Sequence, residues 1–236
     1  MNKILILIAI SIAAYLWFKD PTVTVASSDV TFSYIVKYPD GVSKSSSLPM
    51  LVAFHGNGDT AKGFYESALN EYSDPIRIVL LQGPLRYGRG KAWPWDAPGL
   101  AMYGDAVNDA VMQLAVKYPT QGKPALLGFS GGGEMAYYQA VTHGSDYSYI
   151  FPVSGRLSKD NLPKNQRDIG AEVHAFHGKK DQVVAFPLGK KAVEILQENR
   201  VRTTLTEFDG GHQGIFSSMK TKITNIVQEN IAEIEN

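Results

Sequence analysis

The stretch Gly128-Phe129-Ser130-Gly131-Gly132 joins an apolar run, Ala125–Phe129, to a helix-length segment, Gly131–Thr142. A G-x-S-x-G turn between a strand and a helix holds its serine in strained backbone, and the flanking glycines avoid a collision with the neighbouring chain. A phosphate-binding turn of the dinucleotide type would instead need G-x-G-x-x-G after the first strand, whereas this turn comes late in the chain. The stretch therefore predicts a strand, a sharp turn and a helix, with the exposed Ser130 hydroxyl as a candidate nucleophile.

Short β-rich runs alternate with helix-length segments on both sides of this turn, which is typical of a mainly parallel sheet with helices on both faces. The central runs are almost continuously apolar, as expected for strands that are buried on both faces. The predicted strands are residues 30–38, 50–55, 76–81, 125–129, 149–153, 173–177 and 202–208. The predicted helices are residues 103–117, 131–142, 186–199 and 216–234. We therefore expect an α/β fold.

The composition indicates one large folded domain without a nucleic-acid partner. A chain of 236 residues, 44% of them hydrophobic and 19% charged, can bury a sizeable core and is too apolar to be disordered. Its 23 Lys and Arg residues balance 23 Asp and Glu residues, so it lacks the basic excess that binding to nucleic-acid phosphates requires. The absence of cysteine excludes a disulfide scaffold, cysteine-ligated metal sites and a cysteine nucleophile. We expect neither a metal nor a cofactor.

The N-terminus has the features of an export segment. After Lys3, residues 4–18 form an unbroken run of apolar and small residues, which ends before the helix-stopping Pro21. Thr24-Val25-Ala26 offers a small-residue cleavage site, which suits a signal peptide, but the run also approaches the length of a membrane span. We therefore expect residues 1–26 to be a signal peptide or an N-terminal membrane anchor. Residues 27–236 would then form a domain outside the cytoplasm, which is periplasmic, secreted or attached to the membrane through residues 4–18.

A serine nucleophile needs a base to accept its proton, and an imidazole base needs a carboxylate to hold its tautomer. His212 is the best candidate base, because it follows two glycines in a loop between the last predicted strand and the last predicted helix. Asp181 follows the strand 173–177 on a short loop at the same, carboxyl edge of the sheet. Asp209 is the rival acid, but it would have to fold back on His212 within a single loop. In chains with a G-x-S-x-G turn of this kind, the three groups follow one another in the order serine, acid, histidine. Ser130, Asp181 and His212 occur in that order.

A second glycine-containing turn, His55-Gly56-Asn57-Gly58-Asp59, follows the strand 50–55. Acyl transfer develops negative charge on the carbonyl oxygen, and backbone N–H groups aimed at that oxygen stabilise it. We expect the amides of Asn57 and Gly131 to form this oxyanion hole. His55 is expected to be a buried structural histidine, and the remaining histidines are expected to have structural or surface roles: His143, His174 and His177.

Four motifs taken together resemble the α/β-hydrolase superfamily, and the closest similarity is to its phospholipase/carboxylesterase and acyl-protein-thioesterase branch. They are residues 55–60 (HGNGDT), 128–133 (GFSGGG), 177–184 (HGKKDQVV) and 211–212 (GH). The resemblance implies a three-layer α/β-hydrolase fold, a triad of Ser130, Asp181 and His212, and an oxyanion hole of Asn57 and Gly131. The branch usually has Gln where this chain has Gly131, and Pro where it has Ala185. Dienelactone hydrolases and secreted depolymerase-like esterases are close alternatives.

The lengths of the connecting segments bear on the substrate. Residues 154–171, where larger relatives insert a cap, are too few to form a cap domain, so an open groove is expected. Such a groove suits a water-soluble or bulky ester better than a long-chain triglyceride, and we expect a small-molecule or lipid-like ester as the substrate. Residues 83–99 contain basic side chains together with Trp93 and Trp95, which either form a substrate platform or anchor a long loop.

These observations favour an exported serine esterase that hydrolyses carboxylic esters through an acyl-enzyme. A serine peptidase or an acyltransferase could use the same groups and would differ only in the leaving group or the acceptor. A non-catalytic binding domain would normally lack one of the three triad residues, whereas all three candidates are present. Activity on a panel of esters and amides separates these alternatives.

Overall fold

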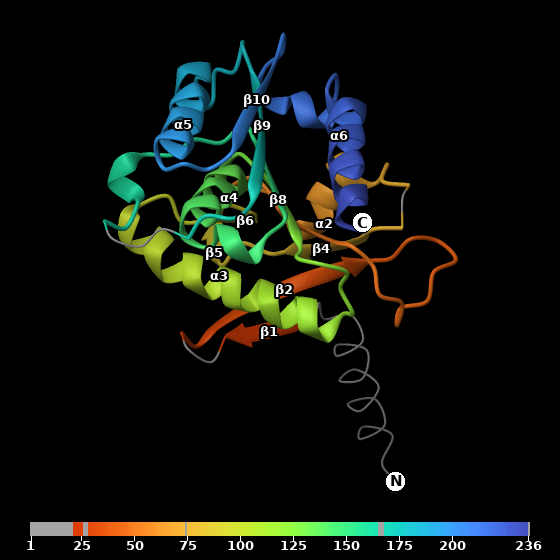
Figure 1. The fold of residues 1–236 in the computed structure, drawn as a ribbon. Helices are drawn as coiled ribbons and strands as arrows, with labels where there is room; N and C mark the ends of the chain where they lie inside the picture. Colours follow the sequence, from red (N-terminus) through yellow and green to blue (C-terminus); the bar gives the residue numbers. More distant parts are fainter. Residues whose placement is uncertain (1–20, 26–27, 74, 165–167, 236) are drawn as a thin grey trace, which may run out of the picture.

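The main sheet has eight strands in the computed structural model, which describes residues 21–25, 28–73, 75–164 and 168–235 (Figure 1). The strand order is β1-β2-β4-β3-β7-β8-β9-β10. Strand β2 is antiparallel to its neighbours β1 and β4, whereas the other adjacent pairs are parallel. The strands are β1 (Thr22–Val25), β2 (Val30–Lys37), β3 (Met50–Phe54), β4 (Arg77–Leu81), β7 (Ala125–Phe129), β8 (Tyr149–Val153), β9 (Glu172–Gly178) and β10 (Thr203–Phe208). A separate antiparallel hairpin consists of β5 (Leu85–Tyr87) and β6 (Gly90–Ala92).

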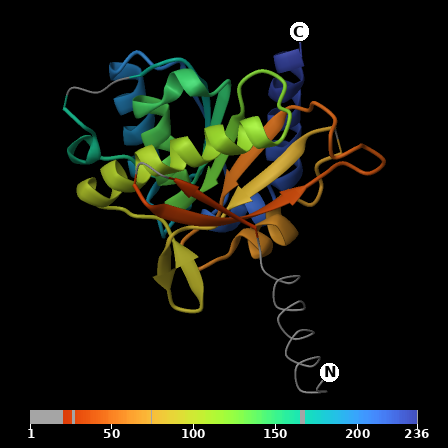
Figure 2. The same ribbon diagram turned by 90° about the horizontal axis from the view of Figure 1, so that it is seen from below.

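Helices cover both faces of the sheet, which gives the three layers expected from the sequence (Figure 1 and Figure 2). One face carries α3 (Ala97–Lys117), α4 (Gly131–Thr142) and α5 (Phe186–Glu198), and the other carries α2 (Ala61–Phe64) and α6 (Lys220–Ala232). The short helical turns are η1 (Tyr65–Leu69), η2 (Gly144–Asp146), η3 (Lys159–Asn161), η4 (His212–Phe216) and η5 (Glu233–Glu235). The described part of segment 154–171 contains only η3, and no cap domain covers the sheet there.

The two faces of the central strands bury alternate residues. In β3, Val52 and Phe54 belong to the core cluster beneath α3 and α4, while Leu51 and Ala53 belong to the cluster beneath α2 and α6. This alternation follows from the two-residue period of a strand. Because both faces are covered, β3, β4 and β7 are buried along their whole length. The near-continuous apolar runs in the sequence were therefore correct indicators of central strands.

Several elements differ from the sequence prediction. The hairpin β5–β6 and helix α2 were not predicted, and α3 begins at Ala97 rather than at residue 103. The earlier start of α3 has a local cause: the Asp96 side chain accepts a hydrogen bond from Gly99 N–H at 2.7 Å, which caps the first turn. Helix α6 begins at Lys220, because Ser217 has a non-helical backbone that separates α6 from η4.

The N-terminal boundary of the domain also moves. Thr22–Val25 pairs with residues 30–33 as an edge strand, and the Val25 side chain is 1% exposed. The described fold therefore already includes residues 21–25, which precede the domain start expected at residue 27. Most of the proposed signal peptide or anchor, residues 1–20, lies outside the described residues. Within the described residues, no helix is both long and apolar enough to span a membrane.

Candidate active site

Ser130 lies on a sharp turn between β7 and α4, as the G-x-S-x-G pattern predicts. Its backbone has φ 53° and ψ −116°, a left-handed conformation that a residue with a side chain rarely adopts. The turn is held by close backbone packing: a Cβ on Gly128 would lie 2.1 Å from the Gly132 carbonyl oxygen, and one on Gly132 would lie 2.4 Å from the Phe54 carbonyl oxygen. Both flanking positions therefore require glycine, and the turn presents Ser130 at the carboxyl edge of the sheet.

Ser130, His212 and Asp181 form one chain of hydrogen bonds. His212 Nδ1 lies 2.7 Å from Asp181 Oδ2, and His212 Nε2 lies 3.0 Å from Ser130 Oγ. In the tautomer that serves both partners, Nδ1–H donates to the carboxylate and Nε2 accepts the serine proton. The three residues come from the ends of β7, β9 and β10, so the crossing order of the sheet brings together groups far apart in sequence. The structure thus brings these predicted residues together.

The Asp181 side chain is 0% exposed and its carboxylate is fully hydrogen-bonded. Oδ1 accepts hydrogen bonds from the backbone N–H groups of Val183 and Val184, each at 2.9 Å, which leaves Oδ2 to face His212. The rival Asp209 has a 76% exposed side chain and pairs with Lys180 at 2.8 Å. That hydrogen bond to Lys180 lowers the pKa of Asp209. Asp181, not Asp209, is therefore the acid next to His212.

His177 is a second imidazole beside the same carboxylate, and the sequence predicted only a structural or surface role for it. It is fully buried, its Nε2–H donates to the Val184 carbonyl at 2.8 Å, and the same nitrogen lies 3.3 Å from Asp181 Oδ2. Burial lowers the pKa of His177, so the neutral ring is favoured. Residues 179–185, which contain Asp181 and are called the acid loop below, thus contact the ring of His177 at both Val184 and Asp181.

His55 has the buried structural role predicted for it. Its Nδ1–H donates to the Gly56 carbonyl at 2.7 Å, and its Nε2 accepts a hydrogen bond from Gly83 N–H at 2.9 Å. Burial lowers the pKa of His55 as well. These bonds join the turn after β3 to the segment after β4. The imidazole does not line the cavity at Ser130.

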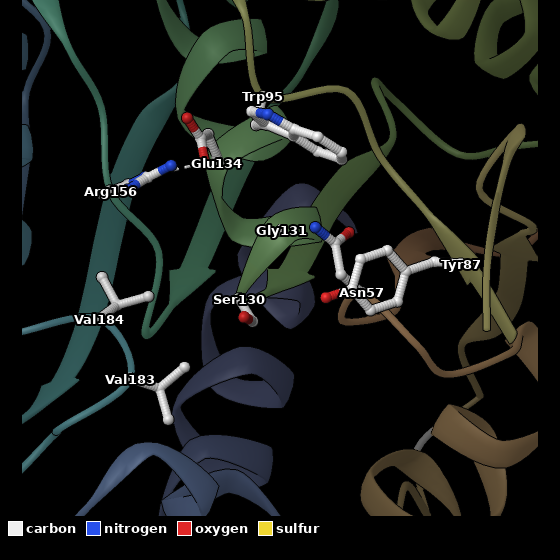
Figure 3. Close-up of a pocket in the computed structure, with 9 residues that line it drawn as sticks. All are labelled: Asn57, Tyr87, Trp95, Ser130, Gly131, Glu134, Arg156, Val183 and Val184. Carbon is white, nitrogen blue, oxygen red and sulfur yellow. Dashed lines mark hydrogen bonds and ion pairs between the residues drawn. The ribbon is translucent and has the colours of Figure 1, made fainter.

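The predicted oxyanion donors, Asn57 and Gly131, lie beside Ser130 in the wall of one cavity (Figure 3). Neither amide N–H donates to another of the described residues, so both remain available to a bound oxygen. The Asn57 side chain is held in place because its Oδ1 accepts from Trp93 N–H at 2.9 Å. A Cβ on Gly131 would lie 2.3 Å from Asn57 Oδ1, which explains why this chain has glycine after the serine.

The cavity at Ser130 has a volume of about 310 Å³ and is open to solvent. Trp95 lines it with a 47% exposed side chain, as expected for a platform. Trp93 does not: its side chain is 0% exposed, and its indole N–H donates to the His55 carbonyl at 2.9 Å. Of the two roles that the sequence left open, Trp93 therefore has the anchoring one and makes no contact with the cavity, because packing against Phe54 and His55 turns the ring inward.

Other residues of the cavity were missed in the sequence. They are Tyr87 from the hairpin, Glu134 from α4, Arg156 after β8, and Val183 and Val184 from the acid loop. The hairpin lies within the segment 83–99 that contains the two tryptophans, but its short strands have no clear period. Within the described residues, no group of three or more acidic or histidine side chains is arranged to hold a metal ion.

Comparisons with known proteins agree with this architecture. The family model described as Phospholipase/Carboxylesterase matches residues 105–231. Esterase PE8 has 19% identity, with a TM-score of 0.69 over 84% of this chain and 98% of that one. The Bacillus cereus carboxylesterase has 13% identity, with a TM-score of 0.67 over 84% and 94% of the two chains.

Zea mays acyl-protein thioesterase 2 has 21% identity, with a TM-score of 0.64 over 84% of this chain and 98% of that one. At these identities, the similarity to solved structures establishes the fold alone. No curated protein sequence matches the chain.

Proposed function

The chain belongs to the phospholipase/carboxylesterase family, and on that premise we propose that it is a serine hydrolase of carboxylic esters. The observation that carries the proposal is the hydrogen-bonded chain from Asp181 through His212 to Ser130, with distances of 2.7 Å and 3.0 Å. This order of groups makes a serine hydroxyl nucleophilic, because the imidazole accepts its proton while the carboxylate stabilises the resulting cation.

The reaction then follows from the geometry. Ser130 Oγ attacks the ester carbonyl as its proton passes to His212 Nε2, and the carbonyl oxygen becomes an oxyanion. The amides of Asn57 and Gly131 stabilise that charge, and Gly131 does so from the first turn of α4, where the helix dipole adds a favourable field. His212 protonates the departing alcohol, and Ser130 remains acylated. Water then attacks the acyl carbon as its proton passes to His212. The bond between that carbon and Ser130 Oγ breaks, His212 returns the proton to Ser130, and the acid is released.

The open cavity supports a small or soluble ester as the substrate. Tyr87 and Trp95 are half-exposed at its rim, where their rings can contact the non-reacting part of the ester. No lid covers the groove in the part of the chain that the structure describes, so the rate should follow the concentration of dissolved ester. Thioesters present the same carbonyl chemistry, and they are the second class to test because one structural neighbour is an acyl-protein thioesterase.

The test is a panel of p-nitrophenyl esters of increasing chain length, acyl thioesters and aminoacyl amides, measured with the wild type and with Ser130→Ala. We expect turnover of short-chain esters and a loss of roughly 10⁴-fold or more in Ser130→Ala. A fluorophosphonate should label Ser130. Labelling at another serine, or near-normal turnover by the alanine variant, would refute the proposed nucleophile.

We also propose, from the apolar run at residues 4–18, that the chain is exported. Fractionation of cells that produce the full chain tests this proposal. Activity confined to the cytoplasm would contradict it.

A further inference from the structure

Glu134 and Arg156 form an ion pair in the wall of the cavity that contains Ser130 (Figure 3). Glu134 is in the first turn of α4, and Arg156 follows β8. Arg156 Nε lies 3.3 Å from Glu134 Oε2, and the two side chains differ greatly in exposure: 7% for Glu134 and 49% for Arg156. The mechanism proposed above uses neither of them.

This ion pair holds the guanidinium by one edge only. Arg156 donates through Nε, while Nη1 and Nη2 form no hydrogen bond or ion pair with any other described residue. Burial raises the pKa of Glu134 and the neighbouring Arg156 opposes that rise, so the carboxylate depends on this cation. A guanidinium that is fixed at Nε and free at both terminal nitrogens presents a planar donor pair to the groove.

The ion pair of Glu134 and Arg156 also lies between two neighbouring cavities. Trp95, Glu134 and Arg156 line both the cavity at Ser130 and a neighbouring one of about 550 Å³. Asn161 Nδ2 donates to the Trp95 carbonyl at 3.2 Å and to Glu134 Oε1 at 3.5 Å, so this junction is held by hydrogen bonds.

The second cavity is lined by the apolar side chains of Leu157, Leu188 and Ile195. The two lysines that also line it are paired with glutamates: Lys159 with Glu198 and Lys191 with Glu194. Among the cationic groups that line these two cavities, Arg156 alone therefore has terminal nitrogens without a described partner.

We propose that Arg156 determines substrate specificity by binding a carboxylate on the non-reacting part of the ester that Ser130 attacks. The inference rests on the proposed esterase function and names its substrate class: half-esters of dicarboxylic acids, or esters of hydroxy acids. In both, an apolar spacer separates the carboxylate from the reacting carbonyl. That spacer would lie along Trp95, because Trp95 lines both cavities together with Arg156.

The first experiment compares charged esters with neutral esters of similar length at pH 7.5, with acid release followed by titration. Monomethyl glutarate, adipate and pimelate place the carboxylate on the acyl side, and methyl hexanoate is their neutral counterpart. Sodium 4-acetoxybutyrate places it on the alcohol side, and butyl acetate is its neutral counterpart. We expect kcat/KM for at least one charged ester to exceed that of its counterpart by roughly tenfold or more.

The second experiment measures the same ratio in variants. Arg156→Met should lower the charged-to-neutral ratio by roughly tenfold to a hundredfold while leaving kcat/KM for the neutral esters nearly unchanged. Arg156→Lys should retain part of the preference, because it keeps the charge and loses the planar donor pair. The matched control is Arg202→Met. Arg202 is an exposed arginine that pairs with Glu172, and it lies just before β10, at the amino ends of the strands and away from Ser130.

Arg156→Met leaves the buried Glu134 carboxylate without its cation, so a double variant, Glu134→Gln with Arg156→Met, guards against misfolding. It should show the same loss of preference. The proposal is overturned if the wild type does not favour any charged ester, if the ratio is unchanged in both variants, or if neutral and charged esters lose activity equally. Failure of the proposed esterase function would look different: the wild type would hydrolyse none of the esters, neutral or charged, or Ser130→Ala would retain activity on the neutral ones.

Discussion

The backbone N–H of Lys180 donates to the carbonyl of Gly210 at 2.9 Å. This hydrogen bond joins the acid loop to residues 209–211, the base loop, which leads to His212. The two loops touch backbone to backbone, since a Cβ on Gly178 would lie 2.3 Å from the Gly210 carbonyl oxygen. The distance from Asp181 to His212 is therefore set by main-chain packing between two loops as well as by the hydrogen bond between the side chains.

Gly178→Ala should separate these loops and weaken the contact between Asp181 and His212. We expect kcat to fall by roughly tenfold or more, because catalytic geometry tolerates displacements of only a fraction of an ångström. The matched control is Gly211→Ala in the base loop, where the added Cβ meets only the Lys180 carbonyl oxygen at 3.7 Å. Ester hydrolysis by the two variants tests this, and equal activity would show that the loop contact does not set the geometry.

Asp181→Asn should lower kcat by several orders of magnitude with little change in KM, because the carboxylate orients the imidazole and stabilises its cation without touching substrate. Asp209→Asn removes only an exposed ion pair with Lys180 and should have almost no effect. Steady-state kinetics on one soluble ester distinguishes the two. A severe defect in the Asp209 variant would reassign the acid.

The buried histidines predict a loss of stability in acid. Burial lowers the folded-state pKa of His55 and of His177 below the usual 6.5, so the unfolded chain binds more protons as the pH falls through that value. The contribution of these two histidines to the free energy of unfolding is thus fully present above pH 6.5 and declines below it. Urea unfolding from pH 7.5 to 5.5 should show a slope of at most about 1.4 kcal/mol per pH unit for each histidine.

His177→Gln is the control for this prediction, since it removes one of the two titrations and should flatten the slope. Glu134 acts in the opposite direction, because its pKa is raised above the usual 4.5 and its contribution weakens as the pH rises. Glu134 is present in both the wild type and His177→Gln. The difference between their two pH slopes therefore reports the titration of His177. An identical slope in the variant would contradict the assignment.

The edge strand β1 should contribute measurably to stability. A variant that begins at Ser27 lacks β1 and loses the buried side chain of Val25 from the core. A variant that begins at Pro21 keeps the strand. We expect the free energy of unfolding to be lower by about 2 kcal/mol or more in the shorter chain, from the lost burial of Val25 alone.

Activity per folded molecule should be the same in both chains, because β1 lies at the edge of the sheet farthest from β10. Urea unfolding and ester hydrolysis of the two chains check both expectations. Equal stability would mean that the strand contributes nothing to the fold.

The sequence by itself determined the parts of this protein that depend on local chemistry. The turn at Ser130 was predictable because close backbone packing at Gly128 and Gly132 admits no side chain, and a residue pattern records that directly. The central strands were predictable because burial on both faces demands a continuous apolar run. The chain order of serine, acid and histidine followed from the same logic, since each lies on a loop just after a strand.

Only the tertiary structure decided which residues meet across those loops. The sequence could not show that Trp93 is buried while Trp95 is exposed, because the burial of Trp93 depends on packing against Phe54 and His55 at the end of β3. It could not show that β1 completes the sheet, since a four-residue strand gains stability only from its neighbour β2. The pairing of Glu134 with Arg156 was also hidden, because β7 and β8 must first lie side by side before the residues after them can touch.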